Sequence, residues 1–294
     1  MNLVDDVLLP GSLWCIMLSM GLSLTVDDFR RVFVNRRGLF VGVGSMLVVP
    51  PLIGLALALL FAPTPALAVG FVLLATCPGG MLSNLMTDIA RGDLALSIAL
   101  TLLVSLIYIA IVPFYAYLAL LHFMDVSQQI EVPLAGFVGG IIGITLVPAG
   151  LGLLVRAYWP ALAMKAKDVI KTVATAVLVG AFVVILVGQV AVLRQNFWTL
   201  FWMTLGMNLL VVAAVIGVTR ITRLNRGESI AVCIEHMIRQ EGTAIFIAVT
   251  IVGSREMSLP MIMNTPVALV ICIAFVTAVR RYLARSSATA ETAA

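Results

Sequence analysis

Thr76-Cys77-Pro78-Gly79-Gly80 interrupts one long apolar stretch of this chain, and Glu235-His236-Met237-Ile238-Arg239-Gln240-Glu241-Gly242 interrupts another. The first run leads directly into the polar pair Ser83-Asn84. Helix breakers and polar groups at bilayer depth are costly unless they line a cavity or bind a ligand. We therefore expect the two interruptions to form the functional site and to determine the fold around it.

The composition of the chain is that of an integral membrane protein. Hydrophobic residues make up 62% of its 294 residues, charged residues make up 11%, and the mean hydropathy is +1.14. Several apolar runs reach the length of about 20 residues that a helix needs to span a bilayer. The net charge of +4 does not indicate nucleic-acid binding, because the basic residues are scattered over short loops and form no dense stripe. The expected partner is the lipid bilayer.

The apolar runs predict an all-α polytopic membrane protein with nine transmembrane helices. The expected spans are residues 8–25, 38–61, 67–90, 94–122, 133–156, 169–192, 197–219, 228–252 and 260–279. If the N-terminus lies outside, most of the Lys and Arg residues in the loops fall on the cytoplasmic side. Only Arg194 and Arg255 then lie outside, and Arg239 is left at bilayer depth.

The two interruptions occupy comparable places in two halves of the chain. We expect a first repeat of four spans in residues 1–127 and a second, inverted repeat of five spans in residues 128–285. If one helix is added at the N-terminus, each break falls in the fourth of five helices. Interrupted helices at matching places in two inverted halves indicate the midplane binding site of a secondary transporter.

Two polar segments lie outside the predicted spans. Residues 26–33, which read Val-Asp-Asp-Phe-Arg-Arg-Val-Phe, are too polar to cross a bilayer, and we expect this amphipathic segment to lie at the membrane surface. Residues 286–294 at the C-terminal end are small and polar, and we expect a disordered tail there.

The residues around the first break resemble those of a known family. Residues 77–87, which begin Cys-Pro-Gly-Gly, together with residues 90–97 and Thr101, are similar to the CPGG-xx-SN-xxx-ARG-[ND]-xALS signature of the bile acid:sodium symporter family. Residues 21–24 and the pair Asp28-Phe29 resemble another stretch of that family. The resemblance implies a panel domain, a core domain in which the two broken helices cross, and a location in a bacterial inner (cytoplasmic) membrane.

The polar residues near the first break form a candidate sodium site. Sodium is a hard cation that takes oxygen ligands, and five residues offer hydroxyl, amide or carboxylate oxygens here: Ser83, Asn84, Ser97, Thr101 and Glu235. Carbonyl groups of the unwound backbone could complete the coordination shell. The resemblance assigns the same positions to the family's first sodium site. The alternative is that these hydroxyls only hydrogen-bond neighbouring helices.

The second break departs from the pattern of the family. The resemblance implies Glu-x-Gly-x-Gln-Asn there, but Arg239 stands at the position of the Gln that binds a second sodium ion, and Ser45 aligns with the other Gln ligand. A guanidinium is a permanent cation without an acceptor atom, so it cannot coordinate sodium. Our hypothesis is that Arg239 replaces the second sodium. Two alternatives remain, a structural ion pair with Glu235 or Glu241 and the binding of a substrate carboxylate.

Substrate recognition is expected at the same breaks. Helix N-termini exposed at a break favour a carboxylate or a similar small organic anion. The resemblance implies that Met81, Gln240 and Asn264 face the substrate, although Met81 stands where Thr is usual and Met263 where His is expected. His236, next to Glu235, could relay protons or make an interhelical hydrogen bond.

The sequence therefore predicts a secondary active transporter, an organic anion:sodium symporter that works by alternating access. One sodium ion and no organic cofactor are expected. An enzyme is not expected, because the sequence contains no evident nucleophile–base pair or cluster of metal ligands. Two alternatives remain open: a sodium-independent transporter, proton-coupled or a uniporter, and a membrane sensor that kept the fold without transport.

Overall fold

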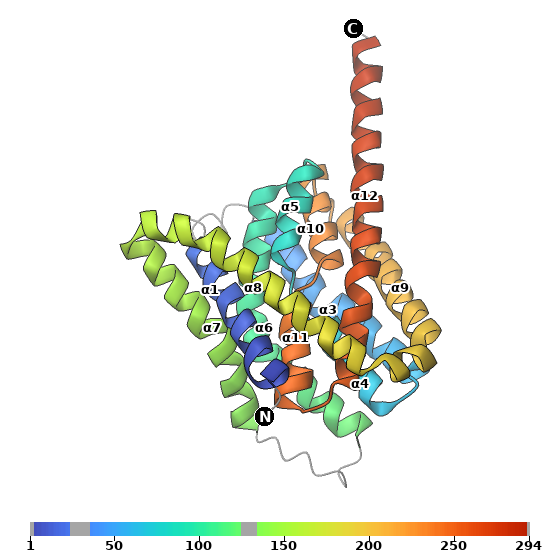
Figure 1. Ribbon diagram of the computed structural model, residues 1–294. Coiled ribbons are helices and arrows are strands. Elements are labelled where there is room, and N and C mark those ends of the chain that lie inside the picture. The colour runs from blue at the N-terminus through green and yellow to red at the C-terminus, as the bar shows by residue number, and fades with distance from the viewer. Residues whose placement is uncertain (1–2, 24–35, 125–133, 293–294) are drawn as a thin grey trace.

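The computed structural model describes residues 3–23, 36–124 and 134–292, and this part of the chain consists of helices and their connections. The amphipathic segment expected at residues 26–33 and the boundary expected between the two repeats at 127/128 lie outside the described residues. Figure 1 shows the helices gathered into one bundle, from which the C-terminal helix projects.

The described helices follow the nine predicted spans in order. They are η1 (Val4–Leu8) with α1 (Leu9–Ser23); α3 (Arg36–Phe61); α4 (Pro65–Ala75) with α5 (Met81–Ile89); α6 (Leu94–Phe123); α7 (Leu134–Tyr158); α8 (Pro160–Gly188); α9 (Val190–Ile221); α10 (Arg226–Met237) with α11 (Glu241–Phe246) and η2 (Ile247–Ile251); and η3 (Glu256–Ser258) with α12 (Leu259–Thr292). Within the described residues, five helices are long and apolar enough to cross a membrane, and shorter apolar helices accompany them. The prediction of an all-α polytopic membrane protein is confirmed.

Two predicted spans begin at the wrong residue. The sixth span was expected to begin at residue 169, but α8 begins at Pro160, where the fixed φ of proline suits the first position of a helix. The seventh span was expected to begin at residue 197, but α9 begins at Val190, immediately after the turn at Gln189. The charged residues Lys165 and Arg194, which lie between the predicted spans, are therefore within helices.

The C-terminal helix is also longer than expected. α12 continues to Thr292, so residues 286–292 are helical where a disordered tail was expected. Ala and Glu in this segment favour helix, and extending an existing helix avoids the cost of nucleation.

The helices form two groups. The panel helices, η1, α1, α7 and α8, pack against one another, and the remaining helices form the core group, in which α9 contacts α3, α10 and α12. Gly21 and Gly152 let α1 and α7 approach closely. A Cβ at Gly21 would lie 2.1 Å from the carbonyl oxygen of Ala149, and one at Gly152 would lie 2.3 Å from that of Leu18. Ser19 Oγ also donates to the carbonyl oxygen of Lys167 on α8 at 2.9 Å.

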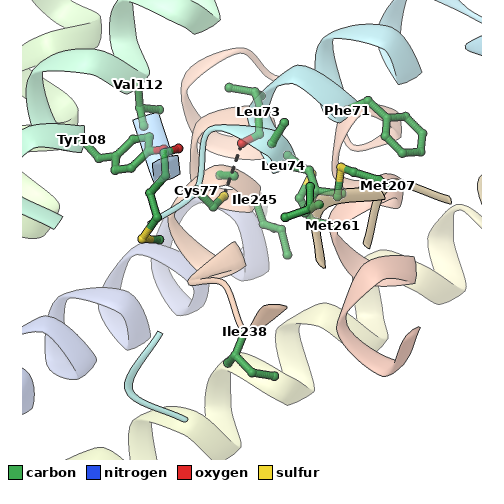
Figure 2. Packing of buried hydrophobic residues seen from close by; sticks show 14 of the residues in the cluster. Phe71, Leu73, Leu74, Cys77, Tyr108, Val112, Met207, Ile238, Ile245 and Met261 are labelled. Atoms are coloured by element: carbon green, nitrogen blue, oxygen red, sulfur yellow. Dashed lines mark hydrogen bonds between the residues drawn. The ribbon is translucent and has the colours of Figure 1, made fainter. Parts of the chain in front are cut away.

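The short helix α4 lies in the middle of the core group. Its residues from Leu67 to Ala75 are all buried, as expected for a helix that is apolar on every side. Figure 2 shows part of its surroundings, with Phe71, Leu73, Leu74, Met207, Ile245 and Met261. Cys77 Sγ lies 3.3 Å from the carbonyl oxygen of Leu73, so the thiol helps to terminate α4. The first break is therefore held inside a packed group of helices.

Candidate functional site

The two unwound segments cross each other in antiparallel orientation. The N–H of Gly80 donates to the carbonyl oxygen of Ile238 at 3.0 Å, and the N–H of Gln240 donates to that of Pro78 at 2.8 Å. Gly79 and Arg239 face each other between these two bonds. The half-helices α5 and α10 lie on one side of the crossing and α4 and α11 on the other (Figure 1). Each break thus provides hydrogen-bond partners for backbone N–H and C=O groups that lose their helical partners in the other break.

Gly79 allows a carboxylate to approach the crossing. A Cβ at this position would lie 1.9 Å from Oε1 of Glu235. Real Cβ contacts are never this short, so any other residue at position 79 would displace the carboxylate. The Pro-Gly-Gly sequence therefore both breaks the helix and makes room for Glu235.

Three hydroxyl groups surround the buried carboxylate of Glu235. Ser83 Oγ lies 2.5 Å from Oε2, Ser97 Oγ lies 3.2 Å from Oε2, and Thr101 Oγ1 lies 2.6 Å from Oε1. The amide oxygen of Asn84 lies 2.9 Å from Ser97 Oγ and 3.3 Å from Thr101 Oγ1, within hydrogen-bonding distance of both. These five residues, here called the Glu235 cluster, are the five that the sequence analysis proposed as sodium ligands, and the structure brings them together.

The Glu235 cluster offers oxygen atoms of the kind that a hard cation prefers. Glu235 is completely buried, and among the described residues it forms no ion pair. Its negative charge is therefore surrounded by neutral oxygens and lacks a direct counter-ion at bilayer depth. A hydroxyl that donates to the carboxylate still has lone pairs for a hard cation. The residues present fit a monovalent cation, and the same hydroxyls also make the interhelical hydrogen bonds that were the alternative expectation.

Arg239 does not form either of the ion pairs considered from the sequence. Its Nη1 donates to the carbonyl oxygens of Ala75 at 2.9 Å and Leu74 at 3.3 Å, and within the described residues it makes no ion pair with Glu235 or Glu241. An (i, i+4) pair requires continuous helix, but α10 ends at Met237, and Ile238 has extended dihedral angles. The structural pairing is therefore wrong for this structure.

The guanidinium of Arg239 occupies the carbonyl end of α4. The C-terminal end of a helix carries a partial negative charge, so a cation is favourable there. Arg239 is 8% exposed, and within the described part of the chain its Nε and Nη2 have no hydrogen-bond partner. Tyr108 of α6 lies nearby, and its hydroxyl donates to the carbonyl oxygen of Met46 on α3 at 2.9 Å. The guanidinium thus points into the core group.

A cavity separates the panel helices from the crossing. It has a volume of about 150 Å³ and is lined mainly by apolar side chains of α1, α6 and α7, with Pro78 and Gln240 from the two breaks and Thr243 of α11. The Nε2 of Gln240 lies 3.3 Å from Sδ of Met17 on α1. The structure therefore places Gln240 beside this cavity, and its contact with a substrate stays a prediction.

The other substrate or coupling residues lie differently. Asn264 is completely buried, its Nδ2 donates to Glu241 Oε1 at 2.5 Å, and its Oδ1 accepts from Asn208 at 2.6 Å, so it does not face this cavity. Met81 begins α5, and its side chain is not among those described. His236 is buried, its Nδ1 lies 2.7 Å from the carbonyl oxygen of Val232, and no hydrogen bond links it to Glu235.

A binding role for Glu241 does not follow from the local sequence. This carboxylate is 7% exposed, lies one residue beyond the crossing, and is bonded by Asn264 and Thr265 of α12. The feature of the sequence that could indicate such a role is the position of Glu241 inside a break at membrane depth. The local sequence offers Glu241 only as a partner for Arg239, because it does not reveal the contribution of α12 to the site.

The sequence is similar to those of known membrane transporters. The sequence pattern of the Sodium Bile acid symporter family matches residues 11–196. A chloroplast protein of Oryza sativa subsp. japonica, described as a probable sodium/metabolite cotransporter, is 34% identical over 145 residues, which are 49% of this chain and 33% of that protein. The ileal sodium/bile acid cotransporter of Oryctolagus cuniculus is 28% identical over 199 residues, which are 67% of this chain and 55% of that protein.

A bacterial relative is also similar. An uncharacterized sodium-dependent transporter of Bacillus subtilis is 33% identical over 144 residues, which are 49% of this chain and 43% of that protein. The chain thus spans between a third and just over half the length of these three relatives. The family match, in contrast, covers more than half of the chain. We conclude that this chain belongs to the Sodium Bile acid symporter family, whose members are transporters and not enzymes.

Proposed function

We propose that the protein is a symporter that couples the inward movement of an organic anion to the entry of sodium by alternating access. The observation that carries this proposal is the Glu235 cluster. A completely buried carboxylate, surrounded by three hydroxyl groups and not ion-paired within the described residues, stands at the crossing of two broken helices. A cation bound there would neutralise Glu235 and also link α5, α6 and α10, which supply the oxygens.

One sodium ion is proposed for each transport cycle, and Arg239 takes the place of a second. Broken helices in transporters hold cations at the carbonyl ends of their half-helices. In this chain the carbonyl end of α4 instead accepts hydrogen bonds from Nη1 of Arg239. The guanidinium is attached to the protein, so its charge does not cross the membrane as a separate ion. This arrangement supports the transport of one sodium ion fewer per organic anion than in a carrier with two sodium sites.

The proposed substrate is a small organic anion with an apolar body. The cavity beside Gln240 is lined mainly by Leu, Met, Val and Ala side chains, which suit an apolar body, while Gln240 at the crossing and Thr243 of α11 offer polar groups. The relatives are described as carriers of bile acids or metabolites, which supports an organic substrate. By analogy with the Bacillus relative, we propose a bacterial cytoplasmic membrane as the location.

Alternating access is supported by the division into panel and core helices. The cavity lies between the two groups, so a rocking movement would open it on one face or the other. At the N-terminal end of α1, Arg255 of the core group forms an ion pair with Asp5 at 2.7 Å, and Thr250 Oγ1 donates to the carbonyl oxygen of Asp5 at 2.9 Å. These contacts would separate when the groups move apart there.

Transport can be tested in proteoliposomes with radiolabelled taurocholate and a panel of radiolabelled monocarboxylates. An inward sodium gradient should drive accumulation of at least one probe above its external concentration, and a potassium gradient should not. The Glu235→Gln variant should lose sodium-driven accumulation, whereas Asp168→Asn, which removes an exposed carboxylate on α8, should keep it. Equal accumulation by Glu235→Gln and the unmodified protein would refute the proposed coupling.

A further inference from the structure

A second buried carboxylate lies on the other side of the crossing. Glu241 is the first residue of α11 and is 7% exposed. Its two oxygens accept hydrogen bonds from different residues of α12, Oε1 from Asn264 Nδ2 at 2.5 Å and Oε2 from the hydroxyl of Thr265. Because it takes no part in the Glu235 cluster, the proposed sodium site does not account for it.

The hydrogen-bond network of Glu241 continues into α9. Asn208 is 1% exposed, and its Nδ2 donates to Asn264 Oδ1 at 2.6 Å and to the carbonyl oxygen of Thr204 at 2.8 Å. Its own Oδ1 has no hydrogen-bond partner within the described residues. Asn264 is therefore fixed with its donor toward the carboxylate. All the direct partners of Glu241 are neutral.

The charged and titratable groups that face Glu241 are few. Among the described residues they are Arg239 of the second break and the Cys77 thiol of the first. Among the described residues of α1, α8 and α12, the side chains that contact Glu241 or lie beside it do not titrate; they include Leu13, Phe182, Asn264 and Thr265. Arg239 directs Nη1 onto the carbonyl oxygens of α4 and forms no ion pair with Glu241. Glu241 thus lacks a direct counter-ion among the described residues.

A cavity gives Glu241 a route for exchange with solution. Its volume is about 270 Å³, and its lining includes Gly80, Gln240, Glu241 and Thr265 together with Phe182 of α8. It lies where α8 passes across α11 and α12 (Figure 1). This volume is large enough for several water molecules. A proton can therefore reach the carboxylate without displacing the helices around it.

The net charge at the crossing, counted with sodium and the organic anion bound, indicates what Glu241 binds. Glu235 and Glu241 carry two negative charges, while Arg239 and one sodium ion carry two positive charges. A bound organic anion would leave one uncompensated negative charge inside the membrane, which is costly. One additional positive charge restores neutrality, and Glu241 is the carboxylate without a sodium site.

We propose that Glu241 takes up one proton when sodium and the organic anion bind, and releases it on the opposite side of the membrane. The carboxylate and a proton from solution become the neutral acid, and the reverse step returns the proton to solution. The carrier then moves one proton together with sodium and the anion. This inference rests on the proposed function for the sodium and the anion, whereas its test requires neither of them.

Infrared difference spectroscopy of the purified protein, between acidic and alkaline buffer, reads the protonation of buried carboxyl groups directly. The unmodified protein should show a protonated-carboxyl band that disappears reversibly in alkaline buffer. The band should be absent from Glu241→Gln and retained in Glu235→Gln. The proposal would be overturned by an unchanged titrating band in Glu241→Gln, or by the absence of any titrating band from the unmodified protein.

A second variant protects the test against misfolding of Glu241→Gln. Thr265→Val keeps the carboxyl group and removes the hydroxyl that donates to Oε2. The band should move to higher wavenumber, because the carboxyl group then accepts one hydrogen bond fewer. Thr277→Val, which removes an exposed hydroxyl on the same helix, should leave the band in place. Failure of sodium-driven uptake with a titrating Glu241 band would refute the proposed function and leave the proton site standing.

Discussion

The hydroxyl of Thr101 donates to Oε1 of Glu235 at 2.6 Å, although 134 residues separate the two in the chain. Thr101 lies on α6, which belongs to the first of the two repeats proposed from the sequence, and Glu235 lies on α10 of the second. The proposed sodium site therefore forms only where the two halves of the chain meet. A change in the distance between α6 and α10 should change the affinity for sodium.

Replacing Thr101 with Val should weaken sodium binding. The two side chains have nearly the same shape, so the substitution mainly removes one oxygen next to the carboxylate. We expect the half-saturating sodium concentration to rise by roughly tenfold, as for the loss of a buried hydrogen-bonding group. A sodium titration of thermal unfolding measures this value. Thr277→Val on α12 is the control, and an equal effect of both variants would contradict a specific role for Thr101.

Replacing Arg239 with Gln should increase the dependence on sodium. The amide oxygen of Gln can coordinate a cation, and the carbonyl oxygens of Leu74 and Ala75 lose the guanidinium that now binds them. The variant should require a second sodium ion, which steepens the sodium dependence of stability or uptake. Arg194→Gln removes an exposed cation on α9 and is the control. An unchanged sodium dependence in Arg239→Gln would show that Arg239 does not replace an ion.

The ion pair between Asp5 and Arg255 should favour the conformation in which panel and core groups touch at the N-terminal end of α1. Arg255 Nε and Nη2 lie 2.9 and 2.7 Å from Oδ2 of Asp5. Such partly exposed pairs contribute about 1 kcal/mol, so Arg255→Gln should shift the equilibrium by roughly fivefold. Labelling of a Thr243→Cys probe in the cavity should then change in rate. The double charge reversal Asp5→Arg with Arg255→Asp should restore the original rate, and failure to restore it would contradict the proposed contact.

Replacing Gly79 with Ala should damage both stability and the sodium site. The added Cβ would lie 1.9 Å from Oε1 of Glu235, so either the carboxylate or the crossing must move. Overpacking of this kind costs about 1–3 kcal/mol, and the sodium-dependent part of the stability should also disappear. Gly206→Ala on α9 is a suitable control, because its Cβ would meet no atom within 4 Å. Chemical unfolding with and without sodium separates the two effects.

The spans and the two breaks could be predicted because their signals are local. Apolar runs of membrane length define the helices, and Pro78, Gly79 and Gly80 cannot continue a helix without cost. The five residues of the Glu235 cluster were predicted from their oxygen chemistry and from a resemblance around the first break. The hydrogen bonds between the two breaks involve only backbone atoms, which all residues share, so no residue type in the sequence indicates their pairing.

The directions of individual side chains at the crossing could not be predicted. Arg239 was expected to meet Glu235 by helical spacing, but the chain leaves the helical path at Ile238, and the guanidinium turns toward α4. Asn264 was expected to face the substrate, yet the carboxylate of Glu241 and the amide of Asn208 engage both of its polar atoms. Such directions depend on packing between helices that are far apart in the chain.

The most direct test of the central claim, that Glu235 and its four neighbours bind sodium, is the thermal stability of the purified protein in sodium, potassium and choline chloride at equal ionic strength. A ligand that binds only the folded state stabilises it by about 2.7 kcal/mol at a hundredfold excess over its Kd, so a real site should give a clear shift. We expect sodium to raise the unfolding temperature, and we expect Glu235→Gln to abolish that rise while Asp168→Asn keeps it. The same unfolding temperature in all three salts, or a sodium effect that persists in Glu235→Gln, would contradict the account.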